Sequence, residues 1–289
     1  MKRSRGEKAF AVFNYIILTA LVVVTLYPFL YVVFGSLSEP SKLLLEEGLL
    51  LKPAGFTLDA YKVVFRNPKV FSGYANTIFY VVVGTSMNIL ATVVAGYVLS
   101  RRQLMLKRPI TLMFIFTMYF SGGMIPNYLL MMDLNLINNR FAVLLPGLVS
   151  TYNLMIMINS LYSVPASLEE SARIDGASHW QIVWKIILPL AKPTIMVIMM
   201  YYAVAHWNSW YNAMLYLQDS NKMPLQLYLR RILIQNRMAE MAGEAAAQED
   251  VGMTIQYATI MVSVLPILII YPVIQKHFIK GVMIGAVKE

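Results

Sequence analysis

The sequence predicts an all-α, polytopic membrane protein with six transmembrane helices and both termini in the cytoplasm. The composition is 58% hydrophobic and only 13% charged, whereas soluble domains are about 45–50% apolar and 25% charged. Six stretches without a charged side chain are each long enough to cross a bilayer, which takes about 20 residues. The basic residues gather on alternate connections between these stretches. Together these observations exclude a soluble enzyme and a disordered chain.

The six predicted spans form one transmembrane domain over residues 1–289. The first span follows a basic start, as a signal sequence does, but its apolar run is far longer than the roughly 7–15 residues of a signal sequence. We therefore expect it to be retained. The spans cover residues 10–35, 74–99, 110–132, 141–162, 193–217 and 254–275.

The basic residues set the orientation, because cytoplasmic loops carry an excess of Lys and Arg. With both termini inside, the whole net charge of +9 falls on the cytoplasmic side. The short loop 101–109 alone contains Arg101, Arg102, Lys107 and Arg108. The positive charge is thus a topology signal, and we expect no nucleic-acid partner.

The cytoplasmic connection 163–192 carries helix signals of its own. Ser167 with Glu170, and Ser178 with Gln181, have the spacing of capping boxes, in which side chains at the helix start satisfy free backbone N–H groups. Gly176 stands between them, where a left-handed residue would end the first helix. The pattern predicts a short helix, a sharp turn and a second helix ending near Pro189. An amphipathic connector resting on lipid headgroups is the alternative interpretation.

The same connection resembles the EAA loop of the permeases of ABC importers. That motif runs E-A-A, three residues, G, nine residues, I, any residue, L-P, and only Ser171 departs from it. The resemblance covers the whole chain, is greatest to the carbohydrate-uptake permeases, and within them to the maltose-type inner-membrane permease. The matching residues are Glu170-Ser171-Ala172, Asp175-Gly176-Ala177, Ile186, Leu188 and Pro189, with Lys280-Gly281 and Gly285-Ala286-Val287-Lys288 in the tail.

The resemblance implies a type I ABC importer permease fold and a set of partners. These are a second homologous permease, a homodimer or heterodimer of ATPase subunits, an extracytoplasmic solute-binding protein, an oligosaccharide and the lipid bilayer of the bacterial inner membrane. Contact with the ATPase would fall to the EAA loop and the tail. The implied coupling residues are Glu170, Ser171, Ala172, Asp175, Gly176, Ala177, Leu188, Pro189, Gly285, Ala286, Val287 and Lys288.

The sequence lacks the features of a nucleotide-binding, metal-binding or ion-coupled protein. It contains no G-x-x-x-x-G-K-[ST] loop to hold nucleotide phosphates, so ATP and magnesium are expected on partner subunits and no cofactor on this chain. The three histidines, His179, His206 and His277, fall in separate elements, and we expect no metal site. None of the six spans contains an Asp, Glu, Lys or Arg, which disfavours an ion-coupled carrier. The chain is therefore expected to be a transport subunit rather than an enzyme.

The fifth span has a polar face that predicts a substrate path. Amides and hydroxyls in lipid are costly, so this face must meet protein or a water-filled lumen, and such groups suit a hydroxyl-rich solute. Helix-to-helix hydrogen bonding by Asn208 and Asn212 is the alternative. The predicted path residues are Tyr201, Tyr202, Asn208, Ser209, Asn212 and Tyr216.

Taken together, these features predict one of two permeases of a bacterial ABC importer for an oligosaccharide. The alternatives are an importer permease for another solute, or a membrane scaffold or enzyme subunit without a transport role. The long outer loop 218–253 is where the family inserts a loop into its binding protein.

Overall fold

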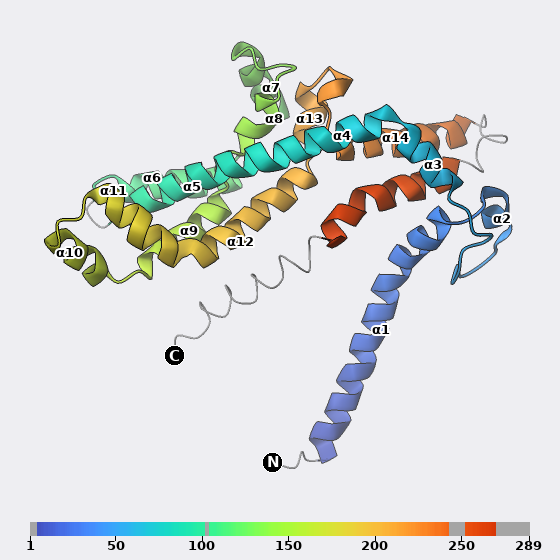
Figure 1. The fold of residues 1–289 in the computed structure, drawn as a ribbon, viewed down its shortest axis with the longest axis horizontal. Coiled ribbons are helices and arrows are strands. Elements are labelled where there is room, and N and C mark those ends of the chain that lie inside the picture. The colour runs from blue at the N-terminus through green and yellow to red at the C-terminus, as the bar shows by residue number, and fades with distance from the viewer. Residues whose placement is uncertain (1–4, 102–103, 243–251, 270–289) are drawn as a thin grey trace. The chain divides into compact units, whose positions relative to one another are not determined.

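The structure is a computed structural model that describes residues 5–101, 104–242 and 252–269. Within those ranges the chain is helical, and its only β-type pairing is a single bridge between Ser38 and Phe56. The chain divides into two compact units, Met1–Val70 with Leu229–Pro266, and Phe71–Tyr228 with Ile267–Glu289. Figure 1 shows the helices that make up the two units.

The lengths and apolar compositions of the helices agree with the prediction of a polytopic membrane protein. Four helices are long and apolar enough to cross a bilayer, and two further pairs qualify if each bent pair is one span, which gives up to six. The four are Gly6–Ser36, Pro68–Ser100, His179–Trp207 and Gly252–Ile269. The bent pairs are Lys107–Tyr119 with Met124–Asp133, at 117°, and Phe141–Gly147 with Thr151–Tyr162, at 53°.

The first unit contains the long helix α1 (Arg5–Ser36), the short helices α2 (Pro40–Leu45) and α3 (Asp59–Arg66), most of α14 (Leu225–Ala242) and most of the helix Gly252–Ile269. The C-terminal end of α1 packs on Tyr257, and Gly35 permits the close approach because a Cβ there would lie 2.7 Å from the Tyr257 ring. Most of the apolar side chains of α1 are exposed. A helix of this kind needs lipid or another protein around it.

Helix α3 carries an ion pair on its surface. Lys62 Nζ donates to Asp59 Oδ1 at 2.8 Å, and this bond, with one from Thr57, lowers the pKa of the Asp59 carboxyl. Both side chains are largely exposed, so the pair adds little stability.

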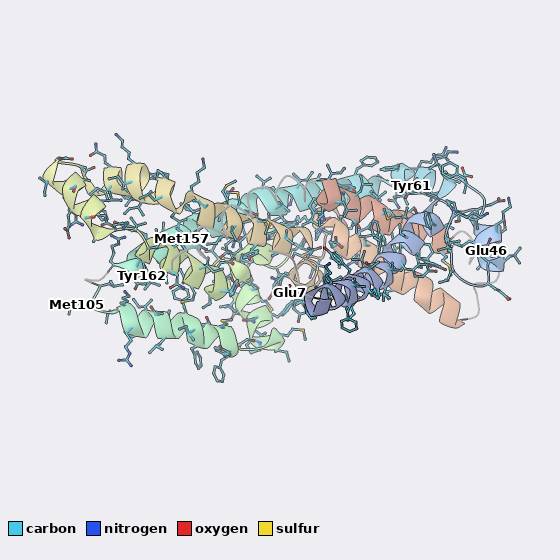
Figure 2. The ribbon with its side chains drawn as sticks, turned by 90° about the horizontal axis from the view of Figure 1, so that it is seen from below. Glu7, Glu46, Tyr61, Met105, Met157 and Tyr162 are labelled. Atoms are coloured by element: carbon cyan, nitrogen blue, oxygen red, sulfur yellow. The ribbon has the colours of Figure 1, made fainter. Side chains whose placement is uncertain are left out.

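The second unit is a helical bundle built around α5, α9 and α12, which lie side by side (Figure 1). Met157 of α9 is fully buried in its interior (Figure 2), and Gly96 of α5 lets the two helices meet, since a Cβ there would lie 2.8 Å from the Met157 side chain. In chain order its elements are α4 (Pro68–Phe79), the π-helical turn η1 (Tyr80–Gly84), α5 (Thr85–Ser100), α6 (Lys107–Tyr119), α7 (Met124–Asp133), α8 (Phe141–Leu144), the 3-10 turn η2 (Leu145–Gly147), α9 (Thr151–Tyr162), α10 (Ala166–Ile174), α11 (His179–Ile182), the π-helical turn η3 (Val183–Ile187), α12 (Leu188–Trp207), α13 (Tyr211–Tyr216) and the 3-10 turn η4 (Ser220–Lys222).

One end of this bundle is marked by Met105 and Tyr162, which Figure 2 labels near each other. Lys107 Nζ lies 4.5 Å from the centroid of the Tyr162 ring, a cation–π contact between α6 and α9. Lys107 belongs to the basic loop that predicted the cytoplasmic side, and its contact shows that this loop adjoins the end of α9.

The helix in the region of the fifth predicted span is offset from the sequence-based boundaries. The expectation of a helix that ends near Pro189 is wrong, because α11, η3 and α12 form one continuous helix, His179–Trp207. Proline lacks an N–H and its ring crowds the carbonyl four residues earlier, here that of Lys185. That carbonyl lies within the wider π-helical turn η3, which accommodates the proline without a break.

Candidate functional site

The EAA loop, residues 163–192, folds as two short helices around a tight turn. At the end of α10, Gly176 N–H donates to Arg173 O at 3.1 Å and Ala177 N–H donates to Ala172 O at 2.9 Å. These two bonds form a Schellman motif, and Gly176 takes the left-handed conformation that the motif requires, with φ of 77°. The predicted turn at Gly176 is therefore confirmed.

Only the second of the two predicted capping boxes is present. Ser178 Oγ accepts from Gln181 N–H, and Gln181 Oε1 accepts from Ser178 N–H at 2.7 Å. The first box, Ser167 with Glu170, is wrong. Pro165 occupies the N-cap position in extended conformation without a side-chain cap, so the helix has already begun at Ala166 and Ser167 lies inside its first turn.

The predicted coupling residues separate into an exposed set and a packed set. Glu170, Ser171, Asp175, Gly176 and Pro189 are exposed. Ala172 and Ala177 pack instead on the core of the second unit beside Leu161 and Ile182, and Leu188 is half-buried. The loop thus has a face anchored to the bundle and a polar face available to a partner. The tail residues Gly285, Ala286, Val287 and Lys288 lie outside the described residues.

An ion pair that the sequence analysis did not anticipate joins the EAA loop to α5. Arg101 Nη1 donates to both carboxylate oxygens of Glu169 at 2.6 Å, and the two side chains are only 26% and 14% exposed. The Arg101 guanidinium also lies 4.3 Å from the centroid of the Tyr97 ring. The two partners are 68 residues apart in sequence, so no local pattern could have revealed the pair.

A pocket of about 420 Å³ lies between the bent helix pair α8–α9 and the end of α12. Its wall is largely apolar but carries several polar groups, after which we call it the polar pocket. Its walls carry amide, hydroxyl, imidazole and phenol groups, and none of the described residues that line it is charged. The lining residues are Val143, Leu144, Gly147, Ser150, Tyr152, Asn153, Tyr201, Tyr202, Ala205, His206, Ser209 and Asn212.

Four of the six predicted path residues line this polar pocket: Tyr201, Tyr202, Ser209 and Asn212. The other two, Asn208 and Tyr216, do not, because α12 ends at Trp207 and the helical-wheel positions no longer apply beyond it. Asn208 is exposed at the helix C-terminus, where its Nδ2 donates to Val204 O at 2.9 Å.

Tyr216, the second of these, is buried on α13. Its ring stacks against that of Tyr128, with centroids 6.2 Å apart, and it packs with Met131 and Ala142. It therefore stabilises the connection between α7, α8 and α13.

The polar pocket contains groups whose hydrogen-bonding capacity differs. Tyr202 Oη is already engaged, bonding Thr92 Oγ1 at 2.8 Å and accepting from Ser150 N–H at 2.9 Å. In contrast, Asn153 Oδ1 is buried without a hydrogen-bond partner in the described part of the chain. A buried amide oxygen of this kind has the capacity to accept from a polar group that enters the pocket.

Asn88 of α5 supports the pocket wall from outside. Its Nδ2 donates to Gly147 O and Leu148 O, both at 2.8 Å, which are carbonyls at the break between η2 and α9. Its Oδ1 therefore accepts from His206 Nε2 at 2.6 Å, so this nitrogen carries the hydrogen. A single buried amide thus fixes both the broken helix and the orientation of a pocket-lining imidazole.

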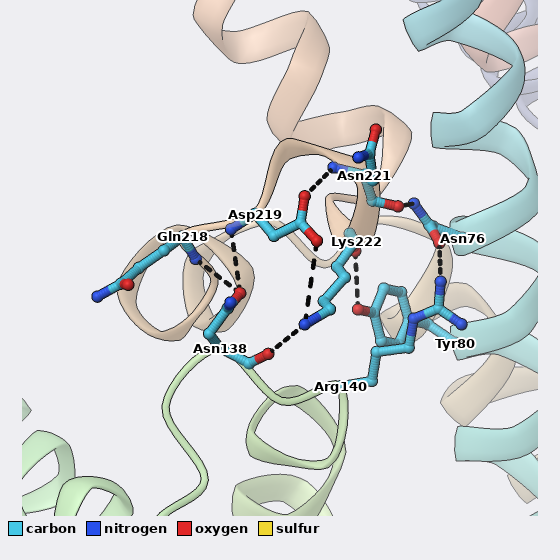
Figure 3. Close-up of polar contacts among 8 residues, drawn as sticks. All are labelled: Asn76, Tyr80, Asn138, Arg140, Gln218, Asp219, Asn221 and Lys222. Carbon is cyan, nitrogen blue, oxygen red and sulfur yellow. Dashed lines mark hydrogen bonds and ion pairs between the residues drawn. The ribbon is translucent and has the colours of Figure 1, made fainter.

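A polar network holds residues 218–223 against the helices of the second unit (Figure 3). Asn76 Nδ2 donates to Asn221 O at 2.6 Å and to Met223 O at 3.1 Å, while Asn76 Oδ1 accepts from Arg140 Nη2 at 2.7 Å. Tyr80 Oη donates to Lys222 O at 2.8 Å. The start of the predicted outer loop is therefore fixed against α4 and η1.

Asn138 holds the same segment from its other side (Figure 3). Its Oδ1 accepts from the backbone N–H groups of Gln218 and Asp219, and its carbonyl accepts from Lys222 Nζ at 2.8 Å. Asn138 has a φ of 59°, a conformation that asparagine adopts more readily than most residues.

The described ranges contain no group of three or more metal-ligating side chains. With apolar spans, a pocket lined by neutral polar groups and an EAA loop of two short helices around a tight turn, the molecule has the features of the permease class of ABC importers. The chain belongs to the family described as "Binding-protein-dependent transport system inner membrane component", which residues 92–284 match.

Known relatives extend along the whole chain. The protein LplC of Bacillus subtilis is 38% identical over 291 residues, covering 100% of this chain and 98% of the relative. The polygalacturonan/rhamnogalacturonan transport system permease protein YtcP of the same species is 38% identical over 282 residues, covering 96% of each.

A solved structure is also similar. It is a chain in the crystal structure of a bacterial ABC transporter involved in the import of the acidic polysaccharide alginate. The TM-score is 0.88 and the identity 35%, covering 96% of this chain and 99% of that one.

These findings confirm the resemblance to ABC importer permeases of the carbohydrate-uptake type and the all-α fold class. The chain is a multi-pass protein of the bacterial cell membrane, and its family role is transport rather than catalysis.

Proposed function

We propose that this chain pairs with a second permease to form the translocation path for an acidic oligosaccharide, driven by ATP hydrolysis on separate subunits. The observation that carries the proposal is the polar pocket of about 420 Å³, with Tyr201, Ser209 and Asn212 in its wall. Amides and hydroxyls bond sugar hydroxyls, and tyrosine rings pack on sugar faces. A neutral wall lets the solute pass without trapping it.

The acidic character of the cargo is supported by the relatives. YtcP is named for polygalacturonan and rhamnogalacturonan, and the similar solved transporter for alginate, at 38% and 35% identity. These polymers carry carboxylates on their sugar rings. Carboxylate oxygens accept hydrogen bonds, and the pocket offers donors for them in its tyrosine and serine hydroxyls and in the amide of Asn212.

Coupling to an ATPase is supported by the geometry of the EAA loop. Glu170, Ser171 and Asp175 form an exposed polar face beside the Gly176 turn, and the two alanines hold the loop on the bundle. A rigid loop of this type can dock in a cleft of a cytoplasmic subunit and transmit its motion. In this arrangement both termini lie in the cytoplasm, ATP and magnesium bind to the partner, and a solute-binding protein delivers the sugar outside.

The test is co-purification followed by a ligand screen. The tagged chain is extracted from its source bacterium in mild detergent, and the associated proteins are identified by mass spectrometry. We expect an ATPase, a second permease and a solute-binding protein. Calorimetry on that binding protein should then show binding of an oligogalacturonide and no binding of maltotriose.

Two results would contradict the proposal at different levels. Recovery of the chain without an ATPase in several detergents would contradict the coupled-importer assignment. A binding protein that takes only maltotriose would refute the acidic cargo and leave the importer assignment standing.

A further inference from the structure

The last turn of α5 carries a polar cluster that contacts both helices of the EAA loop. We call it the Arg101 clamp: Tyr97 and Arg101, with Glu169 of α10 and His179 of α11. Arg101 Nη1 holds both Glu169 oxygens at 2.6 Å, and the Tyr97 hydroxyl shares a hydrogen bond of 3.0 Å with His179 Nε2. The guanidinium over the Tyr97 ring joins the two halves of the clamp.

The two loop residues of the clamp lie on opposite sides of the Gly176 turn. Glu169 precedes the Schellman motif, and His179 follows Ser178, the N-cap of α11. The turn itself is held by backbone bonds and by the Ser178–Gln181 box. The clamp therefore fixes both arms of the loop to one turn of α5, so that neither arm can shift alone.

The charged pair of the clamp, Arg101 with Glu169, is shielded enough from water to matter energetically. Arg101 and Glu169 are mostly buried, and Nη2 of Arg101 donates to Ser100 Oγ at 3.3 Å. Removing one partner would leave a charge in a partly dry environment, which costs far more than the loss of an exposed pair. The Asp59–Lys62 pair on α3, with both side chains exposed, is the natural comparison.

The same helix reaches the polar pocket. Thr92 of α5 bonds Tyr202, and Asn88 bonds His206, and both partners line the pocket. With a rise of about 1.5 Å per residue, α5 spans roughly 20 Å between Asn88 and Arg101. One continuous helix thus connects the EAA loop to the pocket wall through hydrogen bonds at each end.

We propose that Arg101 and Tyr97 are positioning residues that join the EAA loop and α5 into one rigid body, so that displacement of the loop moves the pocket wall. This inference rests on the proposed function, in which an ATPase displaces the loop. It assigns α5, and not only the helix that directly continues the loop, as the element that carries the motion to the substrate path.

The test uses the complete importer in proteoliposomes, with Arg101→Glu, Glu169→Arg and the double charge exchange. Each single variant should still bind the ATPase and keep its basal rate of ATP hydrolysis within about twofold of wild type. The stimulation of hydrolysis by substrate-loaded binding protein should fall roughly tenfold. The double variant should recover part of that stimulation, because the ion pair is restored with reversed polarity while the cation–π contact with Tyr97 is lost. The exchange Asp59→Lys with Lys62→Asp is the matched control and should change nothing.

Tyr97→Phe is the milder variant if a charge reversal prevents assembly. It removes only the bond to His179 and should lower the stimulation by about threefold at unchanged basal hydrolysis. Wild-type stimulation in the single variants and in Tyr97→Phe would overturn the clamp. So would a double variant as impaired as the sum of its parts. A wild-type complex without bound ATPase would instead refute the proposed function, which keeps the two failures distinct.

Discussion

The EAA loop and the 218–223 segment are both connections of the second unit, but they are held in different ways. The turn of the EAA loop is fixed by bonds between residues close in sequence, such as Ala172 to Ala177 and Ser178 to Gln181. The 218–223 segment is fixed by Asn76 and Asn138 over separations of 80 to 147 residues. A loop that is shaped locally can be moved as a unit by a partner, whereas a loop shaped by distant contacts keeps its form only in the folded bundle.

Replacing Asn76 with leucine should have the largest effect. The side chain is buried and makes three hydrogen bonds, so the change leaves two carbonyls and a guanidinium unpaired. We expect a loss of about 2–4 kcal/mol in unfolding free energy, seen as a fall of roughly 5–10 °C in the Tm of the purified complex. Lys222 should also become accessible to trypsin.

Asn127→Leu is the control for this experiment, because Asn127 is exposed on α7. It should leave both the Tm and the tryptic pattern unchanged. An Asn76→Leu complex as stable and protease-resistant as wild type would show that distant contacts do not hold the 218–223 segment.

Gly176→Ala tests the locally shaped loop. A Cβ at this position meets no atom within 4 Å, so the cost is the positive φ alone, about 1 kcal/mol. We expect affinity for the ATPase to fall about fivefold, measured by titrating the ATPase onto the purified permease pair. Tm should change little, in contrast to Asn76→Leu.

Gly122→Ala is matched to it, since a Cβ there meets only Pro126 at 3.7 Å and its φ is not positive. Equal ATPase affinity for the two variants would contradict the role of the Gly176 conformation.

Asn212 and Asn208 are close in sequence but differ in what their side chains contact. Asn212 lines the polar pocket, and Asn212→Leu should raise the KM of transport roughly fivefold by removing hydrogen bonds to the solute. Transport by proteoliposomes over a range of substrate concentrations gives the value. An unchanged KM would remove Asn212 from the substrate path.

Asn208→Leu should have the smallest effect. Its side chain bonds only Val204, one helical turn away, so the change affects the end of α12 and not the pocket. We expect a KM within about twofold of wild type in the same assay. A rise in KM as large as that of Asn212→Leu would mean that Asn208 also belongs to the substrate path, although it lies beyond the end of α12.

The sequence predicted the features that depend on neighbouring residues. Hydrophobic stretches gave the membrane class, and the Gly176 turn and the Ser178 box follow from local backbone chemistry. The EAA loop was identified by its resemblance to a family motif. The first capping box does not form, because Pro165 already provides the extended residue that precedes the helix.

Features that depend on the folded bundle could not be predicted. The helical wheel of the fifth span assumed one continuous helix to Leu217, but α12 ends at Trp207, which moved Asn208 and Tyr216 away from the pocket. The clamp between Arg101 and Glu169 joins residues 68 apart. Asn153 lines the pocket, and Asn88 supports its wall, only because the fourth span bends between Gly147 and Thr151.

The most direct test of the account is uptake by proteoliposomes that contain the permease pair, the ATPase and the binding protein. Labelled oligogalacturonide is supplied outside and ATP inside or omitted. The account predicts accumulation that requires both ATP and the binding protein, and that falls in the Gly176→Ala and Asn212→Leu variants. Failure of the assembled complex to accumulate the sugar while it hydrolyses ATP and holds a loaded binding protein would contradict it.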